Sequence, residues 1–263
     1  MKLRPYQEES IRAIETAWQD FDRTLLVLPT GTGKTIVFSH LAAHATAAGK
    51  RTLILAHRDE LLQQAADKLH LSTGVSSDLE KAGSCAVDSL FSVVVGSVQT
   101  MCRDKRLHAY APDDFDIIII DEAHHALSDS YQKVLAHFPA AKVLGVTATP
   151  DRGDKRNLGS YFQSLAYEYS IRDAIADGYL CKIVAQTIPI DIDLTTVRTV
   201  RGDFSEADLG DAIEPYLVAI AEEMKARVPD RKSVVFLPLI KSSKKMVECL
   251  QAIDMPAEHI DGT

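Results

Sequence analysis

The sequence predicts an α/β fold in which a parallel sheet lies between helices on both faces. Short apolar runs alternate with helical patterns over residues 20–150. The runs are apolar throughout rather than at every second position, as in FDIIIIDE (115–122), which indicates strands buried on both faces. Because strand–helix–strand units join parallel neighbours through right-handed crossovers, this alternation predicts a parallel sheet sandwiched by helices.

Each element of this first part can be placed in order. Strands are expected at TLLVLP (24–29), RTLILAH (51–57), FSVVVGS (91–97), FDIIIIDE (115–122) and KVLGVTATP (142–150). Helices are expected at 34–49, where Gly49 ends the pattern, and at 58–70. Residues 71–90 are polar and weakly periodic, which indicates a connection with one weak strand at most.

The texture of the chain changes after Pro150. Two short helices around a strand are expected up to residue 180, followed by a strand at CKIVAQTIPIDIDL (181–194). A helix at 213–228, a strand at 232–239 and a helix at 242–253 restart the α/β pattern. We expect a first domain over 1–190, a linker or excursion over 191–224, and the incomplete start of a second domain over 225–263.

Composition excludes several classes of protein. The chain has 263 residues, is 46% hydrophobic and 25% charged, and carries a formal net charge of −8. An acidic total does not exclude nucleic-acid binding, which needs only a local basic surface. The four cysteines form no C-x-x-C pair and show no zinc spacing, which indicates reduced thiols. Without an apolar run of about 18 residues or the apolar core of a signal peptide, a cytoplasmic protein with no membrane segment is expected.

The segment PTGTGKT (29–35) lies between an apolar strand and a helix, as a phosphate-binding loop does. Gly31 and Gly33 would let the backbone turn its N–H groups toward an anion at the start of the helix. Lys34 would reach the β- and γ-phosphates of a nucleotide, and Thr35 would place its hydroxyl on Mg²⁺. The general pattern asks for glycine where this chain has Leu28. The alternative is a turn whose lysine and threonine are solvated.

An acidic pair follows the apolar strand at 115–120. Ligands of parallel sheets bind at the carboxyl ends of the strands. There Asp121 would hold Mg²⁺, and Glu122 would orient and deprotonate an attacking water. An acidic pair after a strand more often caps a helix, but a phosphate loop earlier in the chain favours the catalytic interpretation. Hydrolysis fits this pair better than transfer to a substrate hydroxyl.

With PTGTGKT before it and TATP (147–150) after it, DEAH (121–124) resembles the superfamily 2 DEAD/DEAH-box helicases. The closest resemblance is to the branch with the type III restriction enzyme motor subunit and related DNA repair helicases. In that branch the loop lacks its first glycine. Further motifs match in order over nearly the whole chain: RPYQ (4–7) the adenine motif, LILAHRDELLQQ (53–64) motif Ia, VGSVQTM (95–101) motif Ib, GVTATPDR (145–152) motif III and SVVFLPLIKSS (233–243) motif IV.

The resemblance implies a P-loop NTPase (RecA-like) fold, followed by the start of a second RecA-like domain, and it implies roles for individual residues. The nucleotide would contact Arg4, Gln7, Pro29, Thr30, Gly31, Thr32, Gly33, Lys34, Thr35 and His124. Backbone phosphates of a nucleic acid would contact His57, Arg58, Ser97, Gln99 and Thr100, while Thr147 and Thr149 would couple the two sites. Simpler interpretations remain: RPYQ as a helix start with Pro5 in its first turn, motifs Ia and Ib as polar caps, and TATP as a strand exit. His125 receives no role.

The implied function is an ATP-dependent DNA helicase or translocase that uses Mg²⁺ and grips mainly the sugar–phosphate backbone, with weak sequence preference. DNA is preferred over RNA because residues 53–64 and AIADGYL (174–180) look like the restriction and repair branch. An RNA helicase of the same superfamily, or a fragment that binds nucleotide and nucleic acid without meaningful turnover, are the alternatives. The family's motif VI arginine, which completes the ATP site, has no counterpart after motif IV here. We therefore expect an N-terminal portion whose cleft a protein partner or further sequence completes.

Overall fold

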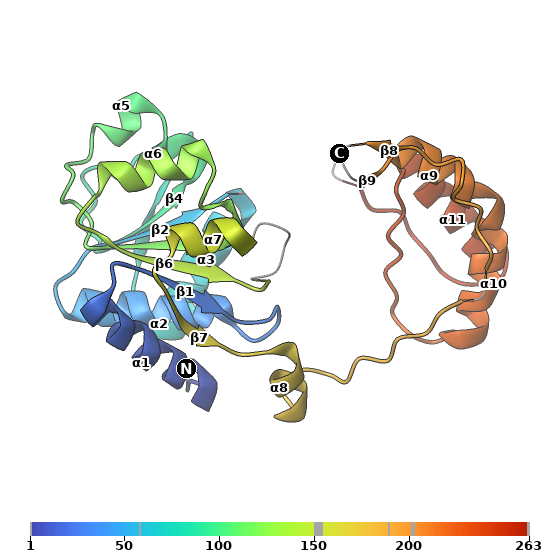
Figure 1. Ribbon diagram of the computed structural model, residues 1–263, viewed down its shortest axis with the longest axis horizontal. Coiled ribbons are helices and arrows are strands. Elements are labelled where there is room, and N and C mark those ends of the chain that lie inside the picture. Colours follow the sequence, from blue (N-terminus) through green and yellow to red (C-terminus); the bar gives the residue numbers. More distant parts are fainter. Residues whose placement is uncertain (1, 58, 150–154, 189, 201–202, 262–263) are drawn as a thin grey trace. The chain divides into compact units, whose positions relative to one another are not determined.

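The structure is a computed structural model that describes residues 2–57, 59–149, 155–188, 190–200 and 203–261. The chain divides into two compact units, Met1–Lys182 and Ile183–Thr263. Each unit is described by itself; Figure 1 shows their elements coloured along the sequence.

The first unit is built on a seven-stranded sheet in the order β3-β4-β2-β5-β6-β1-β7. Every pair of neighbours in it is parallel. The strands are β1 (Arg23–Val27), β2 (Thr52–Ala56), β3 (Ser77–Glu80), β4 (Val93–Ser97), β5 (Ile117–Asp121), β6 (Lys142–Thr147) and β7 (Ser164–Glu168). The expected α/β class and the parallel sheet are therefore confirmed.

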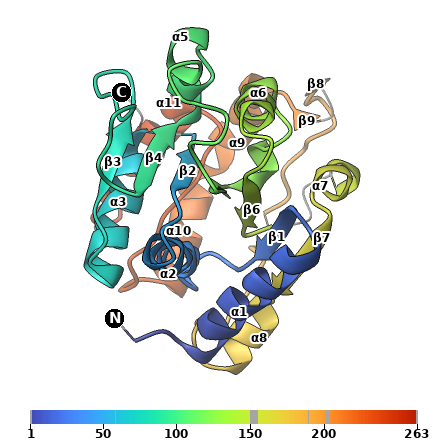
Figure 2. The same ribbon diagram turned by 90° about the vertical axis from the view of Figure 1, so that its left-hand side faces the viewer.

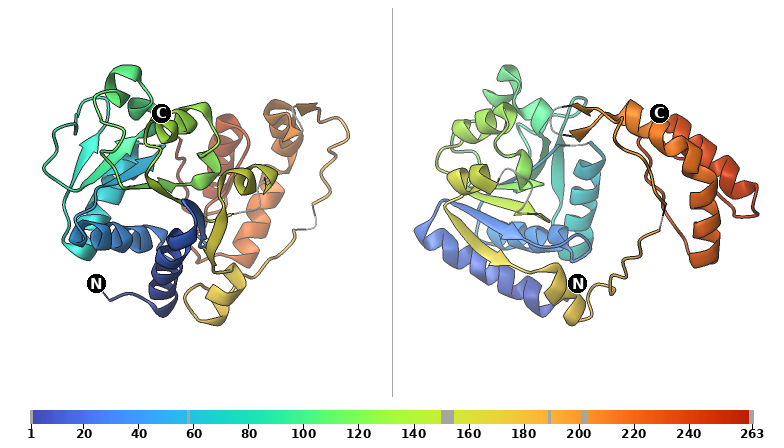
Figure 3. Two further views of the ribbon diagram at one scale, coloured as in Figure 1. Left: turned by 60° about the vertical axis from the view of Figure 1, so that its left-hand side comes forward. Right: turned by 45° about the vertical axis from the view of Figure 1, so that its right-hand side comes forward.

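Helices cover both faces of this sheet, as Figures 2 and 3 show. One layer consists of α1 (Pro5–Asp20), α2 (Lys34–Ala47) and α3 (Asp59–Thr73). The other consists of α4 (Val98–Met101), α5 (Asp104–Leu107), the 3₁₀ helix η1 (Ala123–His125), α6 (Asp129–His137) and α7 (Lys155–Tyr161). A short helix, α8 (Ile171–Ala176), follows β7.

Successive strand residues enter opposite cores, which explains the uninterrupted apolar runs. Leu26 and Leu28 join the core beneath α1, α2 and α3, whereas Leu25 and Val27 join the core on the other face. Each fully buried aliphatic side chain of this kind contributes about 1.5–3 kcal/mol relative to an exposed one. A strand that is buried on both faces has apolar residues at every position, not only at every second one. The uninterrupted apolar runs therefore result from the helices that cover both faces of the sheet.

Residues 71–90 are more ordered than a simple connection. They contain β3 at the edge of the sheet, where the buried carboxylate of Glu80 accepts hydrogen bonds from Ala86 N (2.7 Å) and the Tyr110 hydroxyl (2.8 Å). The polarity that weakened the prediction of a strand is thus satisfied inside the protein.

The second unit contains a small hairpin and a helical cluster. Its elements are β8 (Thr199–Val200), β9 (Asp203–Phe204), α9 (Glu206–Ile213), the 3₁₀ helix η2 (Glu214–Tyr216), α10 (Leu217–Arg227) and α11 (Ile240–Gln251). A core of Leu217, Ala221, Met246 and Leu250 joins α10 to α11. Residues 191–224, expected as a linker or excursion, therefore hold the hairpin, α9 and part of α10.

Two expected strands are wrong for the residues that the structure describes. Neither 181–194 nor 232–239 is paired in a ladder there, and the side chains of Val234 and Phe236 are 78% and 91% exposed. A strand exists only when a neighbour takes its backbone hydrogen bonds, and local composition cannot supply that neighbour.

Among the described residues, no helix has both the length and the apolar character needed to cross a membrane. The four cysteines are free thiols, with Cys85 and Cys181 exposed.

Candidate nucleotide and nucleic-acid site

The strand β1 passes directly into the glycine-rich loop. Leu28, at the position where the general loop pattern has glycine, is fully buried in the core, and its N–H donates to Thr147 O of β6 at 3.0 Å. This residue is still part of the sheet core, so a side chain is accommodated. The absence of glycine at position 28 therefore does not affect the backbone conformation of the turn that follows.

The turn itself requires glycine at two positions. Gly31 has φ 88° and Gly33 has φ 85°, both in the left-handed region that side chains disfavour. A Cβ on Gly33 would lie 2.8 Å from Gln7 Nε2, and one on Gly31 would lie 3.1 Å from Leu180 Cδ2. Lys34 then begins α2, so Lys34 and Thr35 occupy the first turn of a 14-residue helix, where backbone N–H groups and the helix dipole favour an anion.

The segment RPYQ holds this loop from the side. The Tyr6 hydroxyl donates to Thr32 O at 2.6 Å, and Gln7 Nε2 donates to the same carbonyl at 3.0 Å. Gln7 Oε1 accepts from Arg4 N at 3.0 Å, so both ends of the side-chain amide of this buried residue are engaged within the protein. The segment also begins α1 with Pro5. Recognition of adenine by Gln7 stays a prediction, while its contact with the loop is structural.

Three tyrosines gather beside this segment. The Tyr6 ring stacks on Tyr169 at 4.4 Å between centroids and meets Tyr179 edge-on at 5.0 Å. The Arg4 guanidinium lies 4.9 Å from the centre of the Tyr179 ring. Tyr6 and Tyr179 stand within RPYQ and AIADGYL, segments whose resemblance implies no role for either tyrosine, and nothing in the sequence signals Tyr169. Tyr6 and Tyr169 are buried in the core, whereas Arg4 is exposed and Tyr179 is half-buried. The flat surfaces of Arg4 and Tyr179 are of the kind that suits the face of a purine base.

Asp121 ends β5 at the same edge of the sheet as the loop, and Glu122 follows it. β5 and β1 both neighbour β6, so the acidic pair and the loop lie on either side of the carboxyl end of β6. Glu122 has φ 58° and ψ 60°, a strained conformation for a residue with a side chain, and it makes no side-chain capping bond to η1. The helix-cap interpretation of the pair thus lacks its defining contact.

The electrostatics of Asp121 suit a cation ligand. Burial raises the pKa of this carboxyl, the neighbouring Glu122 raises it further, and the charge of Lys34 acts in the opposite direction. Burial disfavours the charged form of this carboxylate, and a bound cation would stabilise that form. The described residues contain no cluster of three or more His, Cys, Asp or Glu side chains for a metal ion. Mg²⁺ does not require one, because a single carboxylate together with hydroxyl, phosphate and water oxygens can supply its ligands.

The predicted coupling threonines lie between the two halves of this site. Thr147 is fully buried at the end of β6, and its carbonyl accepts the Leu28 N–H. Thr147 Oγ1 lies 3.3 Å from both the N and the O of Thr149, which closes the turn after the strand. Thr147 therefore connects the phosphate loop with the exit of β6.

The predicted nucleic-acid residues are only partly at the surface. His57 and Gln99 are exposed, whereas Ser97 and Thr100 are 3% and 4% exposed. Gln99 Nε2 donates to His57 O at 2.6 Å, and Ser97 Oγ donates to Gln99 Oε1 at 2.8 Å. The buried Ser97 side chain is thus hydrogen-bonded to Gln99 and does not face solvent. The prediction for Arg58 falls outside the described residues.

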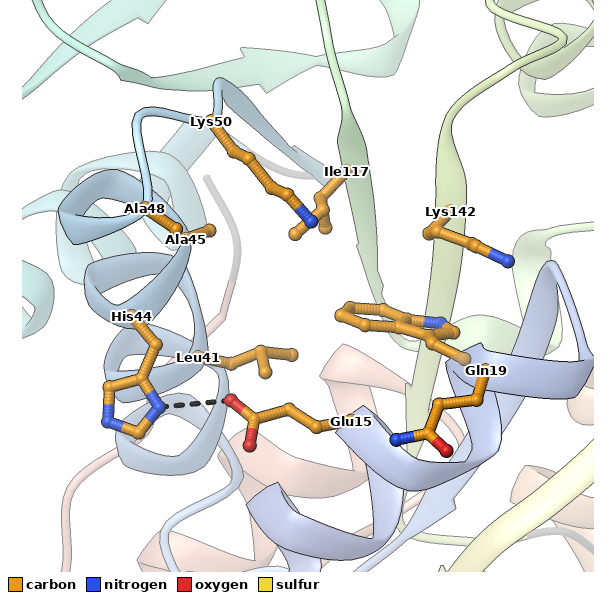
Figure 4. Close-up of a pocket in the computed structure, with 10 residues that line it drawn as sticks. Glu15, Gln19, Leu41, His44, Ala45, Ala48, Lys50, Ile117 and Lys142 are labelled. Atoms are coloured by element: carbon orange, nitrogen blue, oxygen red, sulfur yellow. Dashed lines mark hydrogen bonds and ion pairs between the residues drawn. The ribbon is translucent and has the colours of Figure 1, made fainter.

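A separate hollow of about 270 Å³ lies at the amino ends of the strands. Its lining includes Lys50, Ile117 and Lys142, near the amino ends of β2, β5 and β6, and Figure 4 shows His44 paired with Glu15 at its side. It is therefore distinct from the loop and the acidic pair, which lie at the carboxyl ends of the strands.

Residues 1–152 match the family model of the type III restriction enzyme, res subunit. The chain belongs to this res-subunit family. The predicted kinship with superfamily 2 helicases of the restriction-motor branch is thereby confirmed.

Curated relatives of this res-subunit family member include helicases and a restriction enzyme. The chain is 35% identical over 224 residues to the putative ATP-dependent helicase IRC3 of Saccharomyces cerevisiae, covering 79% of this chain and 32% of that protein. It is 35% identical over 205 residues to the putative mitochondrial ATP-dependent helicase irc3 of Schizosaccharomyces pombe, covering 74% and 34%. It is 31% identical over 209 residues to the type I restriction enzyme EcoAI endonuclease subunit of Escherichia coli, covering 76% and 26%. The chain thus spans about a third or less of these relatives.

Solved structures share the fold of this res-subunit chain. The Hef helicase domain of Pyrococcus furiosus aligns with a TM-score of 0.58 and 21% identity, covering 95% of this chain and 52% of that one. The UvsW helicase of bacteriophage T4 aligns with a TM-score of 0.51 and 20% identity, covering 63% and 60%. These likenesses agree with a RecA-like α/β architecture.

Proposed function

We propose that this chain is the ATP-binding part of a DNA helicase or translocase, in which ATP hydrolysis drives movement along nucleic acid. The observation that carries the proposal is the meeting of three segments at the carboxyl edge of the sheet. The phosphate loop after β1 and the acidic pair after β5 flank Thr147 at the end of β6. This is the edge at which ligands of parallel sheets bind.

The proposed chemistry assigns each residue a separate task. Lys34 binds the phosphates and offsets the charge that develops on them during transfer. Thr35 and Asp121 would hold Mg²⁺, which would offset the negative charge of the nucleotide's phosphates when bound. Glu122 orients a water molecule and accepts its proton, and His124 lies beside it with Nδ1 3.3 Å from Glu122 Oε2.

Nucleic acid is proposed to contact the surface formed by His57 and Gln99. Both are exposed polar side chains at the ends of neighbouring strands, and backbone contacts from such groups carry little sequence preference. DNA is favoured because the relatives include the EcoAI restriction subunit and the "DNA 3'-5' translocase XPB2" of Sulfurisphaera tokodaii, 27% identical over 157 residues. One relative in Acanthamoeba polyphaga mimivirus is named a putative ATP-dependent RNA helicase, so RNA is the second candidate.

The domain organisation is part of the same proposal. Residues 225–263 are proposed to belong to a second RecA-like domain. Cytoplasmic localisation stays a prediction; the relative from Schizosaccharomyces pombe is named as mitochondrial.

Nucleotide binding tests the phosphate site. Titration calorimetry with Mg·ATP should show Lys34→Ala binding about 10- to 100-fold more weakly than the wild type, because a charge-assisted contact to phosphate is lost. Lys50→Ala, at the opposite edge of the sheet, is the matched control and should bind normally. Equal affinity of Lys34→Ala and wild type would remove the phosphate-site assignment.

Turnover then distinguishes the functions. ATP hydrolysis stimulated by DNA supports the DNA motor, whereas stronger stimulation by RNA supports the RNA helicase. Nucleotide binding without hydrolysis, with or without either nucleic acid, supports a binding fragment that needs another part to act.

A further inference from the structure

The ring of His125 lies against the ring of His57, although the two residues come from different motifs. Their centroids are 4.8 Å apart and their planes differ by 23°, which is a stacked arrangement. His57 follows β2 and His125 ends η1 after β5, and β2 and β5 are neighbours in the sheet. The contact therefore joins two loops at the carboxyl edge that hold different proposed sites.

On the nucleotide side, His125 also touches His124. Their ring centroids are 4.1 Å apart, and His124 Nδ1 is 3.3 Å from Glu122 Oε2, within ion-pair distance. The backbone also links His125 to Glu122, since His125 N donates to Glu122 O at 3.0 Å. A change in Glu122 when nucleotide binds would thus reach the His125 ring through side chains and backbone.

On the other side, His57 is held by Gln99. Gln99 Nε2 lies 2.6 Å from His57 O and 3.1 Å from His57 Nδ1, and Ser97 in turn holds Gln99 Oε1. These contacts orient the exposed His57 and Gln99 as one unit. Rotation of the His57 ring would change the contact between His57 Nδ1 and Gln99 Nε2, while the bond from Gln99 to the backbone carbonyl of His57 would remain.

His125 is itself well anchored. Its carbonyl accepts from Ser128 N at 3.0 Å and from Ser128 Oγ at 2.9 Å. A ring on an anchored backbone transmits a displacement to its neighbours rather than absorbing it, because packed side chains have few alternative arrangements. The contacts from Glu122 to Gln99 are continuous, which is the physical requirement for coupling through packed groups.

We propose that His125 is a positioning residue that couples occupancy of the nucleotide site to the nucleic-acid surface of His57 and Gln99. The proposal rests on the proposed function, and it adds a link separate from the one expected at Thr147 and Thr149. The ring contact, rather than proton transfer, carries the effect. By linkage, nucleotide would change the affinity for nucleic acid by the same factor as nucleic acid changes the affinity for nucleotide.

The test measures that coupling factor directly. Fluorescence anisotropy gives the affinity of the full 263-residue chain for a labelled single-stranded DNA oligonucleotide, with and without Mg²⁺ and a non-hydrolysable ATP analogue. We expect a factor of about five or more in the wild type. It should fall to within about twofold of one in His125→Ala, which lacks the ring, and should persist in His125→Phe, which keeps it.

A second histidine pair provides the matched control. His108, which follows α5, and His137, the last residue of α6, have ring centroids 5.6 Å apart, away from the site. His108→Ala should keep the wild-type coupling factor. Thermal unfolding checks that each variant is folded, and His125→Leu replaces the alanine variant if that one fails to fold.

The outcomes separate the inference from the proposed function. A coupling factor that stays at the wild-type value in folded His125→Ala or His125→Leu overturns the inference, as does loss of coupling in His125→Phe. Binding of both ligands by the wild type without any linkage also overturns it and leaves the proposed function standing. Failure of the wild type to bind the analogue at all refutes the proposed function, and the inference falls with it.

Discussion

The Tyr6 hydroxyl donates a 2.6 Å hydrogen bond to the carbonyl of Thr32, 26 residues further along the chain. Tyr6 and Thr32 are both buried, and Thr32 precedes Gly33, whose left-handed backbone starts α2. The bond therefore joins the first helix to the middle of the phosphate loop. We infer that α1 holds the loop in its nucleotide-binding shape before any ligand arrives.

Removing this hydroxyl should loosen the loop. Tyr6→Phe keeps the ring stacked on Tyr169 but leaves the buried Thr32 carbonyl with one donor fewer. We expect a loss of about 1 kcal/mol in the free energy of unfolding and a several-fold weaker affinity for Mg·ATP. Urea unfolding and titration calorimetry measure the two effects.

Tyr131→Phe is the matched control for this substitution. The Tyr131 hydroxyl is buried and has no hydrogen-bond partner among the described residues, so its removal should be neutral or stabilising. If both variants lose the same stability, the bond from Tyr6 is not what secures the loop.

The backbone strain at Glu122 predicts a gain of stability at the cost of activity. Glu122→Gly and Glu122→Gln both lack the carboxylate and should both lose ATP hydrolysis. Only glycine relieves the left-handed conformation at φ 58°. We expect Glu122→Gly to be about 1 kcal/mol more stable than Glu122→Gln in urea unfolding.

Asp254 offers a comparison outside the site, since it is the other described non-glycine residue with positive φ, at 57°. Asp254→Gly should stabilise its own unit while leaving nucleotide affinity unchanged. A Glu122→Gly variant less stable than Glu122→Gln would mean that the surroundings of Glu122 do not hold it under strain.

The buried carboxylate of Glu80 predicts a large effect at Arg106. Arg106 Nη1 lies 2.5 Å from Glu80 Oε1, and the Glu80 side chain is 0% exposed. Arg106→Ala would leave that charge without its partner, so we expect a loss of about 3 kcal/mol in the free energy of unfolding.

Lys133→Ala serves as the control for this ion pair. Its partner is Asp104 at 2.8 Å, and both side chains are largely exposed, at 44% and 77%. Its loss should cost less than about 1 kcal/mol. Similar losses in the two variants would show that the buried pair of Glu80 and Arg106 contributes no more to stability than an exposed pair does.

Tyr167 predicts a fall in stability at high pH. Burial, and then its hydrogen bond to Glu9, raise the pKa of Tyr167 from 10.0 to about 12. The folded state thus holds this proton more tightly than the unfolded chain. The protonated Tyr167 therefore contributes fully to the free energy of unfolding below pH 10, and this contribution is lost as the pH rises to about 12.

Urea midpoints across this pH range, with ultraviolet absorbance of tyrosinate, measure the effect. Tyr167→Phe should make the fall in midpoint less steep, and Glu9→Gln should lower the pKa of Tyr167 by removing the charged acceptor. Identical pH dependence in wild type and Tyr167→Phe would rule out a contribution from this residue.

Much of the fold could be predicted because its causes are local. Runs such as the four isoleucines at 117–120 of β5 are apolar at every position, which is typical of a strand with two buried faces. Gly31 and Gly33 marked the loop because left-handed backbone favours glycine, and both prove to have positive φ. The order of the motifs then sufficed to identify the family.

Elements that depend on a distant partner could not be predicted in this way. The apolar stretch at 232–239 has strand composition but no ladder, whereas the polar stretch at 77–80 forms β3 because β4 lies beside it. Composition describes what a segment would bury, and pairing depends on which neighbour is available.

By itself, the sequence determined the parallel sheet, the glycine-rich turn and the acidic pair, since each follows from residue types and their spacing along one segment. Only the tertiary structure decided that Leu28 belongs to the core, that Tyr6 and Gln7 hold Thr32, and that His125 stacks on His57. These contacts join residues far apart in the chain, and their geometry exists only once neighbouring strands have set the loops at one edge of the sheet.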